Sequence, residues 1–255
     1  MKEKRSAPAL IPLHDGSIFI CGLTSEQEDW AELYDPVKGE FHAKNLRGPV
    51  GCPCPISCFQ WTDQVVMIYY EHWVYDKDWF KSCKPSLLSY NIVEDTWDIF
   101  VENLPPLHGM GVKKLVYVGG DTLFIIDSAR LWFVYDLSSK RQMGDVCVNA
   151  GPRGARVPVK EAYYVSDKDV KSTSWVFCIF MTMPHDNLGN YCDLEYAKVG
   201  VVQGTGGDYF STVLRRGVLK VGPFGDVHIF AKKDKKGKAK TGDGQVNESL
   251  LHYVE

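Results

Sequence analysis

The sequence lacks a long hydrophobic run, a strong excess of one charge and a high cysteine content. Its longest apolar stretches, VVMIYY (Val65 to Tyr70) and WVFCIFM (Trp175 to Met181), are far shorter than the roughly 18 to 20 residues that cross a bilayer. A net charge of −3 gives no global reason to expect a nucleic-acid partner, and eight cysteines are too few for a disulfide scaffold. We therefore expect a cytoplasmic protein with neither a membrane nor a nucleic-acid partner.

A sustained helical pattern is also missing, because no apolar period of 3.6 residues persists for three turns. Short runs of β-branched and aromatic residues alternate instead with turn signals such as Asp15-Gly16, Asp35-Pro36 and Gly119-Gly120. Examples of these runs are GSIFICGL, QVVMIYY and LWFVYDL. This alternation predicts an all-β protein.

Aromatic residues recur at a repeated spacing along the chain. Tyr34 is followed seven residues later by Phe41, and Tyr90 is followed seven residues later by Trp97, each time across a turn signal. The same apolar lead-in precedes three further tyrosines, which are Tyr135, Tyr196 and Tyr253. The period of about 50 to 60 residues predicts a repeat of four-stranded units, in which these tyrosines anchor the third strand.

Four-stranded units of this kind cannot bury both of their faces alone, so they stack radially into a β-propeller. We predict one propeller domain over residues 1–255, with about five blades. The approximate blades are 7–48, 50–104, 105–149, 158–206 and 207–255. The pattern leaves two outcomes open: the N-terminal stretch APALIPL closes the ring against the last unit, or the chain is a fragment of a larger, incomplete propeller.

The pairing of a tyrosine with an aromatic residue seven positions later resembles the kelch repeat, as do units of about 50 residues. The double glycine that follows the second strand in that family is replaced here by Gly22-Leu23, Tyr69-Tyr70 and Asp127-Ser128. The resemblance extends to propellers of the galactose-oxidase type and to those that carry an F-box, although no F-box helix bundle can be placed in this chain. It implies a kelch-like propeller with a scaffold or substrate-receptor role, including substrate recognition for ubiquitin ligases.

Motifs for catalysis or metal binding are weak. Cys52, Cys54, Cys58 and Cys83 could supply four thiolates, but their spacing is not that of a zinc knuckle, and the histidines are scattered. No nucleophile elbow or phosphate-binding loop appears. We therefore expect no enzyme, no cofactor and no metal. The alternative is a propeller that binds a small molecule or carbohydrate, or an oxidoreductase like galactose oxidase.

Two segments are candidates for contact with other molecules. The stretch 71–85 between the second and third strands of the second unit carries Trp73, Tyr75, Trp79 and Phe80 among charges, which is the composition of a binding hot spot. The alternative is that these aromatics pack over the edge of their own blade. The lysine-rich run Lys232 to Lys240 is either a solvated loop within 232–247 or a nuclear import signal, which would add the nucleus as a location. We expect a non-catalytic module that binds protein partners of unknown identity.

Overall fold

The computed structural model describes residues 5–24, 31–42, 55–76, 79–102, 104, 114–127, 130–150, 159–165, 174–184 and 192–220. Within these ranges the protein is all-β: its strands form four antiparallel sheets, and no helix occurs. A search of the same residues for a helix long and apolar enough to cross a bilayer finds none. The predicted fold class is thus confirmed at the level of four-stranded, propeller-type blades.

Each sheet is a meander in which the strands pair in the order in which they follow one another in the chain. The first two blades consist of β1 (Arg5–Pro12), β2 (Ile18–Thr24), β3 (Ala31–Asp35) and β4 (Glu40–His42), then β5 (Ser57–Gln60), β6 (Val65–Asp76), β7 (Trp79–Asn91) and β8 (Thr96–Val101). The last two consist of β9 (Lys114–Gly119), β10 (Thr122–Ile126), β11 (Leu131–Asp136) and β12 (Arg141–Cys147), then β13 (Val159–Tyr164), β14 (Ser174–Pro184), β15 (Cys192–Gln203) and β16 (Tyr209–Lys220).

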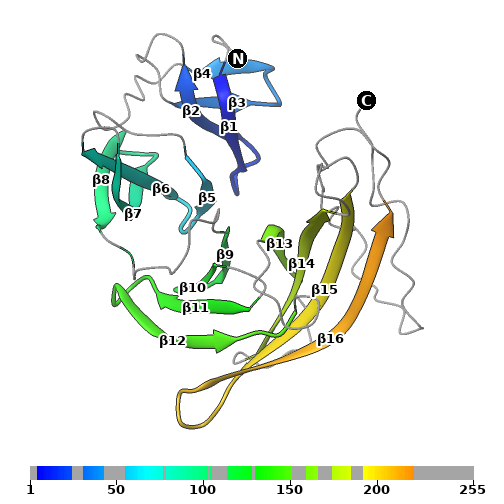
Figure 1. Ribbon diagram of the computed structural model, residues 1–255. Helices are drawn as coiled ribbons and strands as arrows, with labels where there is room; N and C mark the ends of the chain where they lie inside the picture. The colour runs from blue at the N-terminus through cyan, green and yellow to red at the C-terminus, as the bar shows by residue number, and fades with distance from the viewer. Residues whose placement is uncertain are drawn as a thin grey trace.

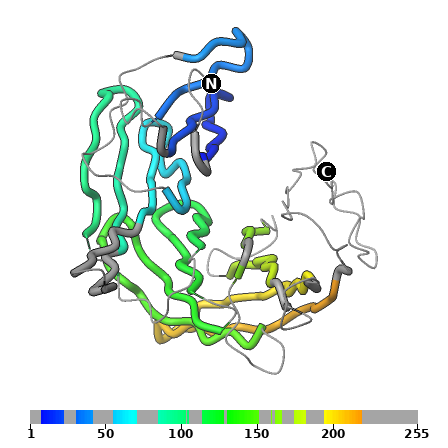
Figure 2. Tube along the Cα trace, turned by 45° about the horizontal axis from the view of Figure 1, so that its top comes forward, coloured from blue at the N-terminus to red at the C-terminus, as the bar shows by residue number. Residues whose placement is uncertain are grey.

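The four blades follow one another along an arc, with the first strand of each blade on the inner side (Figures 1 and 2). Strand β5 contacts both β1 and β9, and β9 also contacts β13, so the inner strands pack against one another in order. The outer strands β12 and β16 are in contact as well. This is the radial stacking of propeller blades.

Three hydrophobic cores lie between consecutive blades. Phe19 of the first blade stacks on Tyr90 of the second, with ring centroids 5.4 Å apart. Phe59 and Tyr117 stack at 5.0 Å between the second and third blades. Phe124 of the third blade meets Phe177 of the fourth at 4.7 Å. Each blade is therefore held by aromatic side chains of its neighbour rather than by a core of its own.

The central strands of the inner blades are apolar without interruption because a neighbouring blade covers each of their two faces. In β6, Val66 and Ile68 belong to the core shared with the first blade, whereas Met67 and Tyr69 belong to the core shared with the third. All four side chains are fully buried. A strand covered on both faces is expected to be continuously apolar, and VVMIYY is such a run.

The predicted count of five blades is wrong for the described residues, which form four. The predicted boundary between residues 206 and 207 separated two strands that pair with each other, since Gln203 of β15 lies opposite Tyr209 of β16. Residues 209–220 are the outer strand of the fourth blade and not the start of a fifth. The other predicted fifth-blade residues, 221–255, lie outside the described residues, as does the basic stretch 232–247.

Candidate interaction face

Two sets of turns lie at one edge of the blades that the structure describes. In an antiparallel meander the first and third turns lie at the same edge of the sheet. The first turns occupy residues 13–17, 61–64 and 120–121 of the first three blades. The third turns occupy residues 36–39, 92–95 and 137–140 of the same blades, and residues 204–208 of the fourth. We call the surface made by these two sets of turns the turn face.

The third turns of the first three blades share one construction, which begins with an aspartate or asparagine. The Oδ1 atoms of Asp35, Asn91 and Asp136 accept hydrogen bonds from backbone N–H groups two or three residues further on, at 2.7 to 3.2 Å. Side chains of this type mimic a backbone turn. Four residues after each of them the chain adopts a positive φ, at Gly39 (71°), Asp95 (56°) and Lys140 (53°). One rigid hairpin turn is thus repeated three times.

Hydrogen bonds from the backbone favour the charged form of these carboxylates. The N–H of Lys38 is the main cause that lowers the pKa of Asp35 below its ordinary value. The N–H of Ser139 does the same for the pKa of Asp136. Both carboxylates therefore remain ionised and keep their turns fixed at neutral pH.

The first turn of the first blade is held in a related way. Asp15 accepts hydrogen bonds from the Ser17 hydroxyl at 2.6 Å and from the Ser17 N–H at 2.9 Å, and Gly16 between them has φ 88°. The hydroxyl of Ser17 is the largest cause of the lowered pKa of Asp15. A residue without a side chain is needed at Gly16 because L-residues rarely adopt this backbone conformation.

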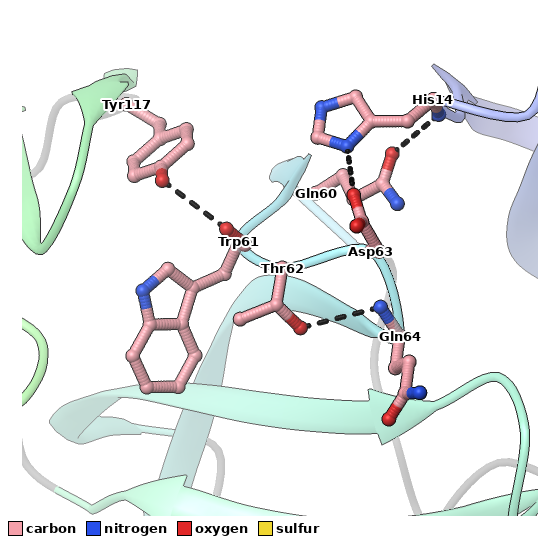
Figure 3. A network of polar contacts seen from close by, with 7 residues as sticks. All are labelled: His14, Gln60, Trp61, Thr62, Asp63, Gln64 and Tyr117. Carbon is pink, nitrogen blue, oxygen red and sulfur yellow. Dashed lines mark hydrogen bonds and ion pairs between the residues drawn. The ribbon is translucent and has the colours of Figure 1, made fainter.

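Polar contacts join the first turn of the first blade to that of the second (Figure 3). The His14 N–H donates to Oε1 of Gln60 at 2.8 Å, and the Nδ1 atom of the His14 ring lies 2.8 Å from Oδ1 of Asp63. The side chains of His14 and Asp63 are 64% and 88% exposed, so solvent screens their attraction. This pair orients the two turns but contributes little to stability.

A second set of contacts joins the second blade to the third. The Tyr117 hydroxyl donates to the carbonyl oxygen of Trp61 at 3.2 Å (Figure 3). It also lies 2.9 Å from the carbonyl oxygen of Gly120. The indole Nε1 of Trp61 donates in return to Oδ1 of Asp121 at 3.1 Å. Burial, and to a lesser extent the charge of Asp121, raise the pKa of Tyr117, so its hydroxyl remains a donor at neutral pH. The first turns of three consecutive blades are therefore linked.

Two valines project from the third turns at the same relative position. Val37 is 94% exposed and Val93 is 67% exposed, and each follows the capping residue of its turn by two positions. The corresponding residue of the third blade is Ser138. Neither valine belongs to the inter-blade cores.

Residue types that also occur in catalytic and metal sites lie on or near the turn face. The contact between His14 and Asp63 supplies two parts of a hydrolytic triad, but in the described part of the chain the His14 ring bonds no hydroxyl or thiol nucleophile. Among the described residues, no three His, Cys, Asp or Glu side chains are grouped as a metal site. Of the predicted thiolate set, Cys58 lies on β5, Cys83 lies on β7 without a described side chain, and Cys52 and Cys54 lie outside the described residues.

The predicted interaction loop at 71–85 is instead a β-hairpin, so the prediction of a loop is wrong. Strand β6 continues to Asp76 and β7 begins at Trp79, with Trp73 opposite Cys83 and Tyr75 opposite Phe80. Aromatic and β-branched residues favour extended strands, and the charged residues between them do not prevent this. The side chains of Trp73, Tyr75, Trp79 and Phe80 lie outside the description, so their role in binding stays a prediction.

The repeat tyrosines occupy equivalent positions in three blades. Tyr34 lies opposite Phe41 with ring centroids 4.7 Å apart, Tyr90 lies opposite Trp97 at 4.6 Å, and Tyr135 lies opposite Gln142. Tyr196 lies in the middle of β15 opposite Gly217. In the fourth blade, the position that the tyrosine has in the other blades, one residue before the last residue of the third strand, is occupied by Val202. Tyr196 is therefore not the counterpart of the other three tyrosines. The strands of the fourth blade are longer, which moves the turn away from this tyrosine.

Sequence reasoning missed the contacts that link the first turns, because they join residues 46 to 60 positions apart. The construction of the third turns, by contrast, can be predicted from the sequence. The segments YDPVKGEF, YNIVEDTW and YDLSSKRQ all place an aspartate or asparagine directly after the tyrosine. That residue type at the start of a hairpin turn predicts the capping hydrogen bonds that the structure shows.

No family model matches the chain, and no curated protein matches it. Among solved structures, the chain is similar to Sqt1 of Saccharomyces cerevisiae, at 12% identity and a TM-score of 0.47, over 88% of this chain and 65% of that one. It is also similar to the C-terminal WD40 domain of Sif2, at 13% identity and a TM-score of 0.39, over 88% of this chain and 59% of that one. The chain thus spans less than two thirds of the length of these two structures.

Proposed function

We propose that this protein is a non-catalytic, propeller-type module that binds a protein partner through its turn face. The observation that carries the proposal is the pair of exposed valines, Val37 and Val93, on turns of identical construction. Their side chains contribute nothing to the inter-blade cores, and they are presented on the same side of neighbouring blades.

Rigidity supports this assignment. A surface that is fixed before binding loses less conformational entropy when the partner arrives. The turns are fixed by capping carboxylate and amide groups, and the blades beneath them are joined through His14, Trp61 and Tyr117. The turn face therefore has the properties of a preformed docking surface, in which small apolar side chains lie among polar backbone groups.

The experiment is a pull-down with tagged full-length protein from a cell extract, followed by quantitative mass spectrometry. The test variant carries Val37→Asp together with Val93→Asp, and the matched control carries Val218→Asp, at an exposed valine of the fourth blade. A partner that is lost with the double variant and kept with the control supports the proposal. Equal recovery with both variants would remove the turn face from the account.

A third arm of the same pull-down addresses the β6–β7 hairpin. The variant Trp73→Ala/Trp79→Ala removes two of the aromatic residues for which a binding role is predicted. If the partner depends on these residues and not on the valines, the hairpin is the docking element and the turn face is not.

The finer role, recognition of substrates for a ubiquitin-ligase complex, rests on the kelch resemblance of the sequence. It predicts that a partner bound through the turn face becomes more abundant in cells when this protein is deleted, and that proteasome inhibition abolishes the difference. A partner of unchanged abundance and half-life would restrict the function to that of a scaffold.

A further inference from the structure

The face of the fourth blade that points away from the third blade carries two cationic side chains in register. On the other face, Ala197 and Val199 of β15 are fully buried in the core shared with the third blade. Side chains alternate between the two faces along a strand, so Lys198 lies on the outer face. Arg215 of β16 is the direct partner of Lys198 and shares that face. Like charges directly opposite one another on two strands are unfavourable for the fold.

A β-bulge places an apolar side chain next to Arg215. The register of β15 and β16 shifts after Lys198, which leaves Leu214 as the extra residue of β16. The side chain of Leu214 lies 3.5 to 3.7 Å from the position of a Cβ added to Gly200, which is a residue of the outer face. Two successive residues of β16 therefore point to the same face. Bulges re-aim side chains in this way, and they are common beside functional sites.

Exposed apolar side chains continue this surface toward the last turn of the blade. Val202 of β15 lies opposite Phe210 of β16, and these side chains are 49% and 62% exposed. Leu214 is 54% exposed. We call the surface formed by Val202, Phe210, Leu214, Lys198 and Arg215 the cationic face. It combines large apolar side chains with a pair of positive charges, and none of its five residues is acidic.

The cationic face is held in place from behind by hydrogen bonds to the third blade. The Ser211 hydroxyl donates to the carbonyl oxygen of Cys147 at 2.7 Å. The guanidinium group of Arg216 donates to the carbonyl oxygen of Asn149. These bonds hold β16 against the neighbouring blade, where it also contacts β12. A surface that is fixed in this way loses little conformational entropy when a partner binds.

We propose that the cationic face, which is separate from the turn face, binds a protein segment that presents an acidic side chain among large apolar ones. A carboxylate between Lys198 and Arg215 offsets the repulsion of these cations, and apolar side chains beside it cover Val202, Phe210 and Leu214. A second copy of the same face does not fit, because the interface would then hold four cations and no carboxylate. Two cations are also fewer than the about four to eight that mark an anionic-lipid site.

The probe is a phage-displayed library of random peptides, selected on the immobilised full-length protein. Enriched peptides are then synthesised with a fluorescent label, and their Kd is measured by fluorescence anisotropy. The test variant is Lys198→Glu with Arg215→Glu, and the matched control is Lys38→Glu with Arg141→Glu, at exposed cations of the first and third blades. Arg215→Glu alone creates an opposite-charge pair with Lys198, so it should fold at least as stably as the wild type and separates lost binding from lost folding.

We expect the enriched peptides to carry Asp or Glu among large apolar residues, and their affinity to fall about tenfold in the test variant but not in the control. A peptide with Lys in place of the acidic residue should bind the test variant better than the wild type. No enrichment, enriched peptides without an acidic residue, or equal affinity for test variant and control would overturn the proposal. Binding of phosphatidylserine vesicles that depends on Lys198 and Arg215, without any enriched peptide, would overturn it in favour of a lipid surface.

Discussion

Tyr90 carries the clearest single prediction, because it joins the repeat of the sequence to the packing between blades. Its ring is 1% exposed and stacks on Phe19 of the first blade, while its hydroxyl donates to Oδ1 of Asp95 at 2.6 Å. Asp95 is the residue of the second-blade turn that adopts a positive φ. The hydrogen bond thus ties a core side chain to a backbone conformation that is unfavourable for an L-residue.

The change Tyr90→Phe keeps the ring and removes the hydroxyl. Hydrogen bonds to charged groups contribute about 1.5 to 3 kcal/mol, but Asp95 is exposed and regains water when the hydroxyl is lost. We therefore expect the free energy of unfolding to fall by about 1 to 1.5 kcal/mol at pH 7, at the low end of that range. For a chain of this size the melting temperature should fall by roughly 2 to 5 °C.

The pH dependence gives an independent signature. Burial, with the contact to Asp95, raises the pKa of Tyr90 above its ordinary value near 10. A raised pKa in the folded state stabilises the protein below the unfolded pKa, and this contribution is lost as the pH rises above about 10. The difference between wild type and Tyr90→Phe should therefore be constant from pH 7 to 9 and shrink between pH 10 and 11.

The assay is a double-mutant cycle, with unfolding in urea followed by tryptophan fluorescence. Asp95→Gly removes the acceptor and relieves the left-handed backbone conformation, so Tyr90→Phe should have almost no effect in its presence. Tyr34→Phe is the matched control, because the first blade has Gly39 where the second has Asp95. An equal loss for Tyr90→Phe with and without Asp95 would refute the reasoning.

Three further predictions concern stability in urea. Gly144→Val should cost about 1 to 3 kcal/mol, since a Cβ there would lie 2.8 Å from the Tyr209 ring, whereas Gly200→Ala should be tolerated. The lowered pKa of Asp136 stabilises the folded state above the unfolded pKa, and this stabilisation is lost as the pH falls through the folded pKa. In Asp136→Ala, the free energy of unfolding should therefore decrease less between pH 5 and 3 than it does in the wild type. Phe124→Ala should cost about 3 to 5 kcal/mol by opening a cavity between the third and fourth blades. A loss below about 1 kcal/mol for Phe124→Ala would contradict the described core.

The sequence contained enough information to predict four-stranded blades, because alternation and turn residues act locally. Tyr34 and Tyr90 each directly precede the aspartate or asparagine that caps the turn, and each lies opposite an aromatic residue of the fourth strand. The residues that form a hairpin turn are close in sequence, so their pattern is visible without a structure.

The blade count could not be derived in the same way. Strands β15 and β16 are each 12 residues long, whereas β11 and β12 have 6 and 7, and no local pattern announces this lengthening. A tyrosine that looks like the others in sequence therefore lies in mid-strand. The links from His14 to Asp63 and from Tyr117 to Trp61 depend on how the blades stack, which periodicity does not specify.

Site-specific photo-crosslinking tests the central claim, that the turn face binds a protein partner, most directly. A photoreactive amino acid would replace Val37, Val93 or, as the control, Val218 in the full-length chain in cells. We predict crosslinks from positions 37 and 93 to one and the same protein, and none to that protein from position 218. Crosslinks to that protein from position 218 alone, or from none of the three positions while it still co-purifies, would contradict the account.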